Sequence, residues 1–183
     1  DNFEWHMEYR MSTLELKELS HPSGEVIKIA AGKTLDLKSQ GTTTLPTGSV
    51  LQVVSVGDAN ATQTTSTGFQ PSSLSVTITP VSSSSKILIQ VTGFGNVAGN
   101  SQHSVFTIYR DSAELSGKSH GFGNYYSVGS GFTEFFIAMS HLDSPSTTSA
   151  TTYKVYFRSS SSASVSFGSG ARKSTITAME IAG

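Results

Sequence analysis

From residue 49 to the end of the chain, apolar residues recur at every second position in a series of short segments. In residues 73–79, Leu, Val and Ile alternate with Ser and Thr, and residues 153–158 alternate in a similar way. Because successive side chains of a β-strand point to opposite faces, this period of two predicts strands with one buried face. In the second segment, Tyr153, Val155 and Phe157 are expected to point inward and the residues between them outward.

The same region shows no convincing helical spacing of apolar residues with caps, so parallel βαβ architectures are not expected. The predicted strands are residues 49–56, 74–78, 87–91, 105–110, 132–141, 153–158, 164–167 and 175–181. The second and third of these are expected to form one hairpin across the serine turn at 82–85. About eight to ten antiparallel strands over this length predict an all-β, jelly-roll-like β-sandwich.

The last predicted strand is apolar on both faces. Ile176 and Ala178 share one face, and Met179 and Ile181 share the other. Since an apolar strand needs cover on both sides, we expect Met179 and Ile181 to contact other copies of the chain. By analogy with jelly-roll proteins that assemble around a three-fold axis, the expected assembly is a homotrimer.

Composition narrows the possible partners. The formal net charge of −1 gives no extended positive field, and that field supplies most non-specific affinity for nucleic acid, so we expect no nucleic-acid partner. The absence of cysteine excludes disulfides, thiolate nucleophiles and cysteine-based zinc sites. No stretch of the sequence approaches the roughly 20 continuous apolar residues of a membrane helix, so we expect no membrane partner.

The pattern divides the chain into three parts: an N-terminal extended arm at 1–24, a short β neck or stem at 25–46 and a sandwich domain at 47–183. The neck holds two short apolar segments, 26–29 and 34–37. Two such strands cannot bury a core alone, but they would be stable if three copies wound together. An irregular segment lying on the main domain explains the same pattern equally well.

The arm contains an unusual alternation of large apolar and polar residues. Phe3, Trp5, Met7 and Tyr9 stand at every second position, which predicts an extended strand with one apolar face. Since an exposed row of such residues favours association, we expect these four side chains to pack on another protein. Met11 is a plausible start, so residues 1–10 are expected to be an upstream extension or a processing product.

Two short segments imitate enzyme motifs. Residues 93–98 match the glycine spacing of a dinucleotide-binding turn, and residues 117–121 match the spacing around a hydrolase nucleophile. Both motifs work only where a strand leads directly into a helix, and no helix is predicted after either segment. The acidic residues of the domain form no local pair of the kind that cleaves glycosides. We therefore expect that the protein is not an enzyme and that it has no cofactor.

The histidines are scattered along the sequence, with no two at the spacing of metal ligands. They are His6, His21, His103, His120 and His141. A metal on a trimer axis could take one histidine from each copy, but a single loop histidine is more often solvated, so we expect no metal site.

The strongest candidate for ligand binding is the segment 117–131, which we expect to be a loop. Its side chains with binding chemistry stand among glycines and serines: His120, Phe122, Asn124, Tyr125 and Tyr126. Aromatic faces can stack on sugar rings, and Asn and His supply directional hydrogen bonds, so carbohydrate is the expected ligand. The alternative is that the aromatic residues anchor a long loop or contact another subunit. The segment 97–103 is a second, weaker candidate.

Five segments of the chain, taken in order, resemble the short tail-fibre or virion structural proteins of tailed bacteriophages, especially phages of marine and cyanobacterial hosts. The segments are residues 11–14, 45–54, 76–80 with the following 86–89, 106–111 and 176–181. Together they extend over most of the chain from Met11 to the end. The resemblance implies a homotrimeric virion component that is assembled in the host cytoplasm, and it carries no catalytic residues. The segment before Met11 departs from the pattern.

Two functions follow from this resemblance. The first is a tail-fibre or tip protein whose loops contact host surface glycans while the arm, through Phe3, Trp5, Met7 and Tyr9, attaches it to other virion proteins. The second is a capsid decoration protein, of the cement or head-fibre kind, in which the arm binds neighbouring subunits and the loops face water. Both use the same fold.

Overall fold

The structure is a computed structural model that describes residues 31–32, 45–99, 101–129 and 131–183. The chain divides into two units, residues 1–44 and residues 45–183, and the second unit is the subject below. The proposed arm at 1–24, with Phe3, Trp5, Met7 and Tyr9, lies outside the described residues, as does most of the proposed neck.

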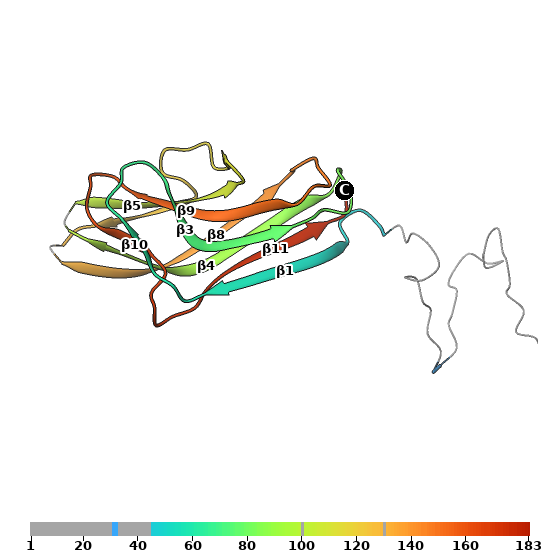
Figure 1. The fold of residues 1–183 in the computed structure, drawn as a ribbon, viewed down its shortest axis with the longest axis horizontal. Coiled ribbons are helices and arrows are strands. Elements are labelled where there is room, and N and C mark those ends of the chain that lie inside the picture. The colour runs from blue at the N-terminus through green and yellow to red at the C-terminus, as the bar shows by residue number, and fades with distance from the viewer. Residues whose placement is uncertain (1–30, 33–44, 100, 130) are drawn as a thin grey trace, which may run out of the picture. The chain divides into compact units, whose positions relative to one another are not determined.

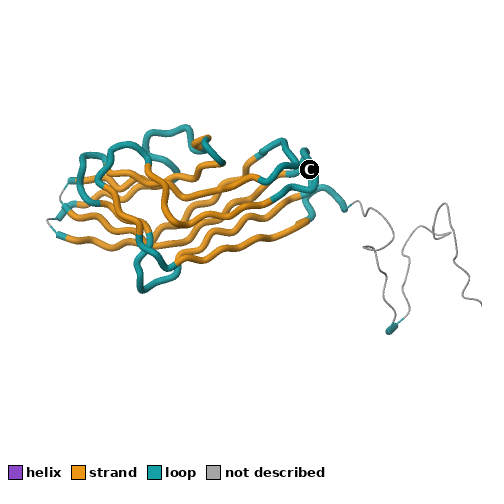
Figure 2. Tube along the Cα trace, in the orientation of Figure 1, coloured by secondary structure: helices purple, strands orange, loops and turns teal. Residues whose placement is uncertain are grey.

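The described part of residues 45–183 is built from β-strands and loops (Figures 1 and 2). The strands are β1 (Val50–Asp58), β2 (Thr62–Thr64), β3 (Gln70–Ile78), β4 (Lys86–Ala98), β5 (Gln102–Arg110), β6 (Ala113–Glu114), β7 (Gly123–Ser127), β8 (Phe132–Asp143), β9 (Thr151–Ser159), β10 (Val165–Phe167) and β11 (Ser174–Ile181). Within the described residues, no helix has the length and apolar character needed to cross a membrane.

The strands form two antiparallel sheets that pack face to face as a β-sandwich. In sheet A, β1, β11 and β4 are neighbours in that order, and β8 lies on the other side of β4. The short strand β10 pairs with the last part of β4, and β2 pairs with β10. In sheet B, the order is β3, β9 and β5, with β6 and β7 along the remaining side of β5. The prediction of an all-β sandwich is confirmed.

The longer strands pair in a nested order. β1 pairs with β11, β3 with β9, β4 with β8 and β5 with β7, so the first strand pairs with the last and the pairing continues inward. The chain is thus one long antiparallel ribbon that is wound across the two sheets. At its open end, the amide of Gly48 donates to the carbonyl of Ala182 at 2.8 Å, and the amide of Ala182 donates to the carbonyl of Ser49 at 2.8 Å.

The predicted hairpin between residues 74–78 and 87–91 is wrong. β3 pairs with β9 in sheet B, whereas β4 pairs with β11 and β8 in sheet A. The two strands therefore lie in opposite sheets, and the serine turn carries the chain from one sheet to the other. The sequence pattern could not separate these cases, because a strand with one buried face has the same alternation in a hairpin and across a sandwich.

The core lies between the sheets and is aliphatic and aromatic. Tyr153, Val155 and Phe157 are fully buried, while the residues between them are half-buried on the outer face, as the alternation predicted. The other large core side chains include Leu74, Val76, Ile78, Ile87, Ile89, Phe106, Ile108, Phe167 and Ile176. Ile176 and Ala178 point into this core, and Met179 and Ile181 lie on the outer face of sheet A, so the prediction for the two faces of β11 is confirmed.

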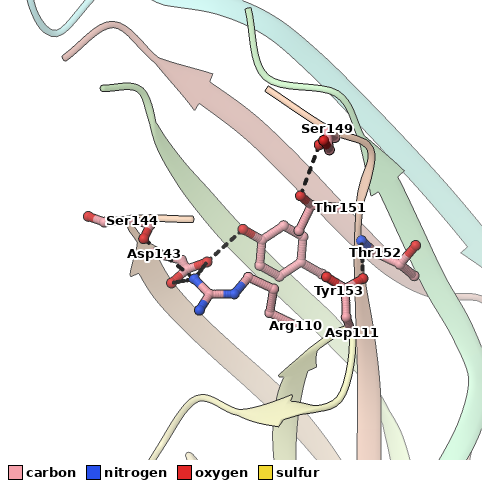
Figure 3. Close-up of polar contacts among 8 residues, drawn as sticks. All are labelled: Arg110, Asp111, Asp143, Ser144, Ser149, Thr151, Thr152 and Tyr153. Atoms are coloured by element: carbon pink, nitrogen blue, oxygen red, sulfur yellow. Dashed lines mark hydrogen bonds and ion pairs between the residues drawn. The ribbon is translucent and has the colours of Figure 1, made fainter. Parts of the chain in front are cut away.

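One side of the core is closed by a polar cluster (Figure 3). The buried hydroxyl of Tyr153 donates to Oδ2 of Asp143 at 2.7 Å, and Nη1 of Arg110 lies 2.9 Å from both carboxylate oxygens. Burial, followed by the hydrogen bond to Asp143, raises the pKa of Tyr153, so its hydroxyl remains a donor. The cluster joins β5, β8 and β9 without leaving the buried carboxylate unpaired.

A second buried carboxylate lies in sheet A. Glu180 is fully buried and accepts hydrogen bonds from Nε2 of Gln52 at 2.5 Å and from the amide of Val81 at 2.8 Å. Desolvation raises the pKa of Glu180, but the hydrogen bonds, led by that from Gln52, outweigh it, so the net pKa is lowered. Glu180 thereby ties the turn between β3 and β4 to the last strand.

Candidate functional site

The segment 117–131, predicted as one loop, contains strand β7 at the edge of sheet B. Glycine and serine are frequent in this segment, and they concealed the strand because both favour turns. The strand has a physical consequence for the candidate residues. Since neighbouring side chains of a strand point to opposite faces, the five candidates cannot form a single surface.

Two of the candidates point inward. Tyr125 stacks on Phe135 with ring centres 4.3 Å apart, and the ring of Phe122 lies 5.0 Å from that of His141. Both pack against the edge of the hydrophobic core. Phe122 and Tyr125 therefore anchor the edge of sheet B to β8, as the structural alternative for these aromatic residues proposed.

A cavity of about 180 Å³ lies between the edges formed by β7 and β8. Its wall is mainly aromatic, with Phe106, Tyr125, Phe135 and Phe136, and Asn124 is also part of the lining. The volume is below that of drug-sized ligand pockets, which begin at about 300 Å³. The cavity is thus suited to one small apolar group.

The other three candidates lie on the outer face of sheet B and gather around a fourth residue, His103. The amide of Asn124 is hydrogen-bonded to Nδ1 of His103 at 2.7 Å. The rings of Tyr126 and His120 lie 4.6 Å and 5.2 Å from the ring of His103. His120, Asn124 and Tyr126 are exposed, so the cluster presents two imidazoles, an amide and a phenol to the surroundings.

The segment 115–121 folds back over the outer face of sheet B. Val105 and Thr107 point away from the core, yet both are fully buried because this segment covers them. Gly121 has a φ of +61°, and a side chain there would overlap the carbonyl oxygen of Phe106, so only glycine permits this path.

Glu114 holds the beginning of the covering segment. Its carboxylate accepts hydrogen bonds from the amide of Ser116 at 2.9 Å, from the amide of Gly117 at 2.7 Å and from the hydroxyl of Thr107. Desolvation raises the pKa of Glu114, but these bonds and that from the hydroxyl of Ser116 lower it more, so the net pKa is below the ordinary value. Glu114 therefore fixes the beginning of the covering segment at Ser116 and Gly117.

Arg158 supports the same segment from β9. Its Nη2 donates to the carbonyl of Ser119 at 2.6 Å, and its guanidinium lies 5.3 Å from the ring centre of Phe69. Arg158 pairs across the sheet with Val105, and Val105 pairs with Asn124. Arg158 and Asn124 are therefore the two ends of one row, and the covering segment lies between them.

An aromatic group continues the outer face of sheet B beside Arg158. The rings of Tyr109 and Tyr156 are stacked at 4.0 Å, and Phe69 meets Tyr109 edge-on at 6.1 Å. Desolvation, followed by the charge of Glu114, raises the pKa of Tyr109. We refer to His103, His120, Asn124, Tyr126 and Arg158, with this aromatic group, as the sheet-B site.

Such a surface can hold a sugar. The aromatic rings offer stacking faces, and the imidazole, amide and guanidinium groups supply directional hydrogen bonds to hydroxyls. Five members of the sheet-B site were not among the ligand residues named from the sequence: His103, Arg158, Phe69, Tyr109 and Tyr156. His103 ended the weaker candidate segment 97–103, and Arg158 was expected to point outward, so the missing information was the sheet register that joins them.

The outer face of sheet A is different in chemistry. An apolar row crosses it through Val53, Met179, Leu88 and Leu142, which are neighbours on β1, β11, β4 and β8. Val53 is 56% exposed and Leu142 is 50% exposed. The next row is polar, and a hydroxyl pair between Ser55 and Thr177 at 2.8 Å lies within it. Met179 is thus part of a continuous apolar band, and Ile181 follows it on the same face.

A second apolar patch lies farther along sheet A. Phe94 and Phe136 meet edge-on at 5.6 Å, and Arg172 lies 5.0 Å from the ring centre of Phe94 while it pairs with Glu134 at 2.8 Å. Phe132, at the start of the same strand, is 65% exposed.

The segments that imitate enzyme motifs have other roles in the fold. Residues 93–98 lie within β4, which leads through a turn into β5. Ser119 lies in the covering segment, and the next element is β7. Among the residues that the structure describes, no three His, Asp or Glu side chains are grouped so that they could hold a metal ion.

Neither protein-family models nor curated proteins match the chain. Among solved structures, the chain is similar to one described as the structure of infectious bursal disease virus Gx strain, with a TM-score of 0.40 and 13% sequence identity. The similarity covers 82% of this chain and 41% of that chain, so the chain spans less than half of its length.

Proposed function

We propose that this protein is a structural component of a tailed-phage virion, a homotrimeric jelly-roll that binds host surface glycans through the sheet-B site. A jelly-roll is a sandwich of eight strands in two Greek keys, and the nested pairing of eight strands across the two sheets supports it here. The resemblance of five segments to tail-fibre and virion structural proteins supports the virion role.

The observation that carries glycan binding is the convergence of His103, His120, Asn124 and Tyr126 on one outward surface. Tyr126 is 45% exposed although its ring contacts His103. An exposed aromatic ring beside polar groups offers a sugar both a stacking face and directional hydrogen bonds. The covering segment, which Glu114 and Arg158 hold in position, pre-organises the surface before a ligand arrives.

The apolar band of sheet A supports the trimer. Val53, Met179, Leu88 and Leu142 would remain in contact with water on a monomer, and contiguous exposed apolar surface marks protein contacts. The occupant we propose is another copy of this chain, because the band crosses β1 and β11 and so lies on the strands that begin and end the sandwich. Each copy would thereby cover the outer face of its neighbour's last strand.

The test is to label the full-length protein and to image its binding to host cells, with Tyr126→Ala as the variant. We expect Tyr126→Ala to abolish cell binding and to remain a trimer in analytical ultracentrifugation. Phe132→Ala, which removes an exposed aromatic ring from sheet A, is the matched control and should bind like the wild type. Undiminished cell binding by Tyr126→Ala would contradict adhesion through the sheet-B site.

A capsid decoration protein is the second candidate, and the patch around Phe94, Phe132 and Phe136 favours it. Two of these rings are more than 60% exposed and lie apart from the apolar band, so they could pack on a neighbouring virion protein. The arm with Phe3, Trp5, Met7 and Tyr9 would attach the trimer to the virion in either function. Labelled protein that decorates particles but never host cells, with binding lost in Phe136→Ala, would support decoration.

A further inference from the structure

We infer that the sheet-B site selects acidic glycans, meaning oligosaccharides whose sugars carry carboxylates. The inference rests on the proposed adhesion function and adds the class of ligand to it. It starts from the charges on the outer face of sheet B.

Arg158, the arginine of the sheet-B site, has no anionic partner among the described residues. Arg110 pairs with Asp143 and Arg172 pairs with Glu134, whereas no carboxylate of the described chain lies within ion-pair distance of Arg158. Its bonds are all to carbonyl oxygens: Ser119 at 2.6 Å, and Thr67 and Ser159 at the long distance of 3.4 Å. A guanidinium has five N–H donors, so donors remain for a planar carboxylate.

The charges around Arg158 are two lysines and one carboxylate. Lys154 and Lys118 belong to the strand and the segment that form this face. The carboxylate nearest in the sequence to the covering segment, Glu114, is already engaged by two amides and two hydroxyls. An anion that approaches the sheet-B site therefore meets Arg158 and two lysines, while the carboxylate of Glu114 already accepts four hydrogen bonds.

The pairing of β7, β5 and β9 indicates how long a ligand must be to reach both Tyr126 and Arg158. Tyr126 pairs with His103, and Arg158 is in the next row on the same face, two strands away from β7. Neighbouring strands are about 4.8 Å apart, so the backbone positions of Tyr126 and Arg158 are roughly 10 Å apart across the sheet. That separation exceeds one pyranose ring, so we expect an oligosaccharide with a ring on Tyr126 and a carboxylate at Arg158.

The experiment compares matched probes by titration calorimetry on the full-length trimer. Each probe is an acidic oligosaccharide, such as oligogalacturonate, sialyllactose or a hyaluronan fragment, together with its carboxyl methyl ester, which has the same rings but no charge. Since a hydrogen bond to a charged group contributes about 1.5–3 kcal/mol, we expect at least one acid to bind about tenfold or more tightly than its ester. The preference should decrease with salt.

Three variants locate the effect. Arg158→Gln should reduce the preference for the acid to about parity, whereas Arg172→Gln, which removes the same charge from the outer face of sheet A, should leave it unchanged. Arg158 also supports Ser119, so Arg158→Lys is included: it retains the charge and should retain most of the salt dependence. A thermal unfolding curve for each variant separates loss of the fold from loss of the ligand.

The outcomes distinguish this inference from the proposed function. Equal affinity for acids and esters, with both lost in Tyr126→Ala, would overturn the selectivity and leave glycan adhesion standing. An acid preference that survives in Arg158→Gln would also overturn it. Binding to no probe of the panel, acidic or neutral, would count against adhesion itself.

Discussion

The outer faces of the two sheets are built from similar strands but differ in how their side chains are covered. On sheet A, an apolar band and an aromatic patch remain open to the surroundings, with polar rows between them. On sheet B, a segment of the chain itself covers Val105 and Thr107 and adds His120 to a polar and aromatic site. The comparison teaches that an open flat face is suited to another subunit, whereas a face that is already covered and ordered is suited to a small ligand.

The largest effect is expected from a charge in the apolar band. Met179→Asp should convert the proposed trimer to monomers, because burial of an apolar side chain contributes about 1.5–3 kcal/mol and a buried unpaired charge opposes association in every copy. Sedimentation velocity measures the change. Ser75→Asp, on the outer face of sheet B, is the control and should remain trimeric. A trimeric Met179→Asp would mean that the band of sheet A is not the interface.

The next effect concerns the core that the two faces share. Asp143→Ala leaves Arg110 and Tyr153 without their common partner; because Arg110 is 29% exposed, the expected cost is that of lost hydrogen bonds to a charged group, about 1.5–3 kcal/mol. Tyr153→Phe, which removes only one hydrogen bond, should cost about 1 kcal/mol. Chemical denaturation measures both. Equal losses in the two variants would show that the ion pair contributes nothing beyond the tyrosine bond.

A smaller effect is expected from Glu180, beneath sheet A. Its pKa is lowered in the folded chain, so the stabilisation is complete above the ordinary glutamate pKa and is lost as the pH falls through the folded pKa. Glu180→Gln should cost about 1 kcal/mol at neutral pH and should flatten the acid limb of the unfolding curve. Denaturation from about pH 3 to pH 7 tests this. An unchanged acid limb would assign the acid sensitivity to other carboxylates.

Glu114 should produce a local effect that is confined to sheet B. Its pKa is also lowered by hydrogen bonds in the folded chain, so acid should release the covering segment while the sandwich stays folded. Glu114→Gln should make the segment more mobile at neutral pH, with faster hydrogen exchange at the amides of Ser116 and Gly117. The amides of β11 serve as the internal reference. Simultaneous loss of protection in both regions would show that the segment does not open separately.

The smallest effect is expected from the exposed ion pair on sheet A. Arg172→Gln should change the free energy of unfolding by less than about 1 kcal/mol, because both Arg172 and Glu134 are largely solvated. Thermal denaturation measures it. A larger loss would indicate that the contact of Arg172 with Phe94, and not the ion pair, stabilises that patch.

The sequence predicted the fold class because apolar residues recur at every second position of a half-buried strand. The faces of β9 followed directly, since Phe157 and its neighbour Arg158 differ in chemistry, whereas β11 is apolar on both faces. Strand pairing could not be obtained in this way, because alternation reports which face is buried and not which strand lies beside it. That limit explains the mistaken hairpin between β3 and β4.

For a related reason, the sequence predicted only part of the candidate site. His120, Asn124 and Tyr126 were identified by their chemistry, but Tyr125 and Phe122 have the same chemistry and point into the sandwich. The two groups differ because β7 is a strand, in which neighbouring side chains point to opposite faces. Arg158 is about forty residues away in sequence from Ser119 and reaches it through the sheet register, which local patterns do not contain.

The nested pairing has a mechanical consequence. Residues 48–49 and 182 lie side by side at one end of the sandwich, while β4 ends and β5 begins at the other end (Figure 1). If the chain is held through residues that precede β1 and a ligand is held near His103, tension runs along the strands. The hydrogen bonds between β1 and β11 are then loaded together in shear and not opened one after another. An adhesin with this strand order would resist a pull toward its ligand far better than a peel applied at Gly183.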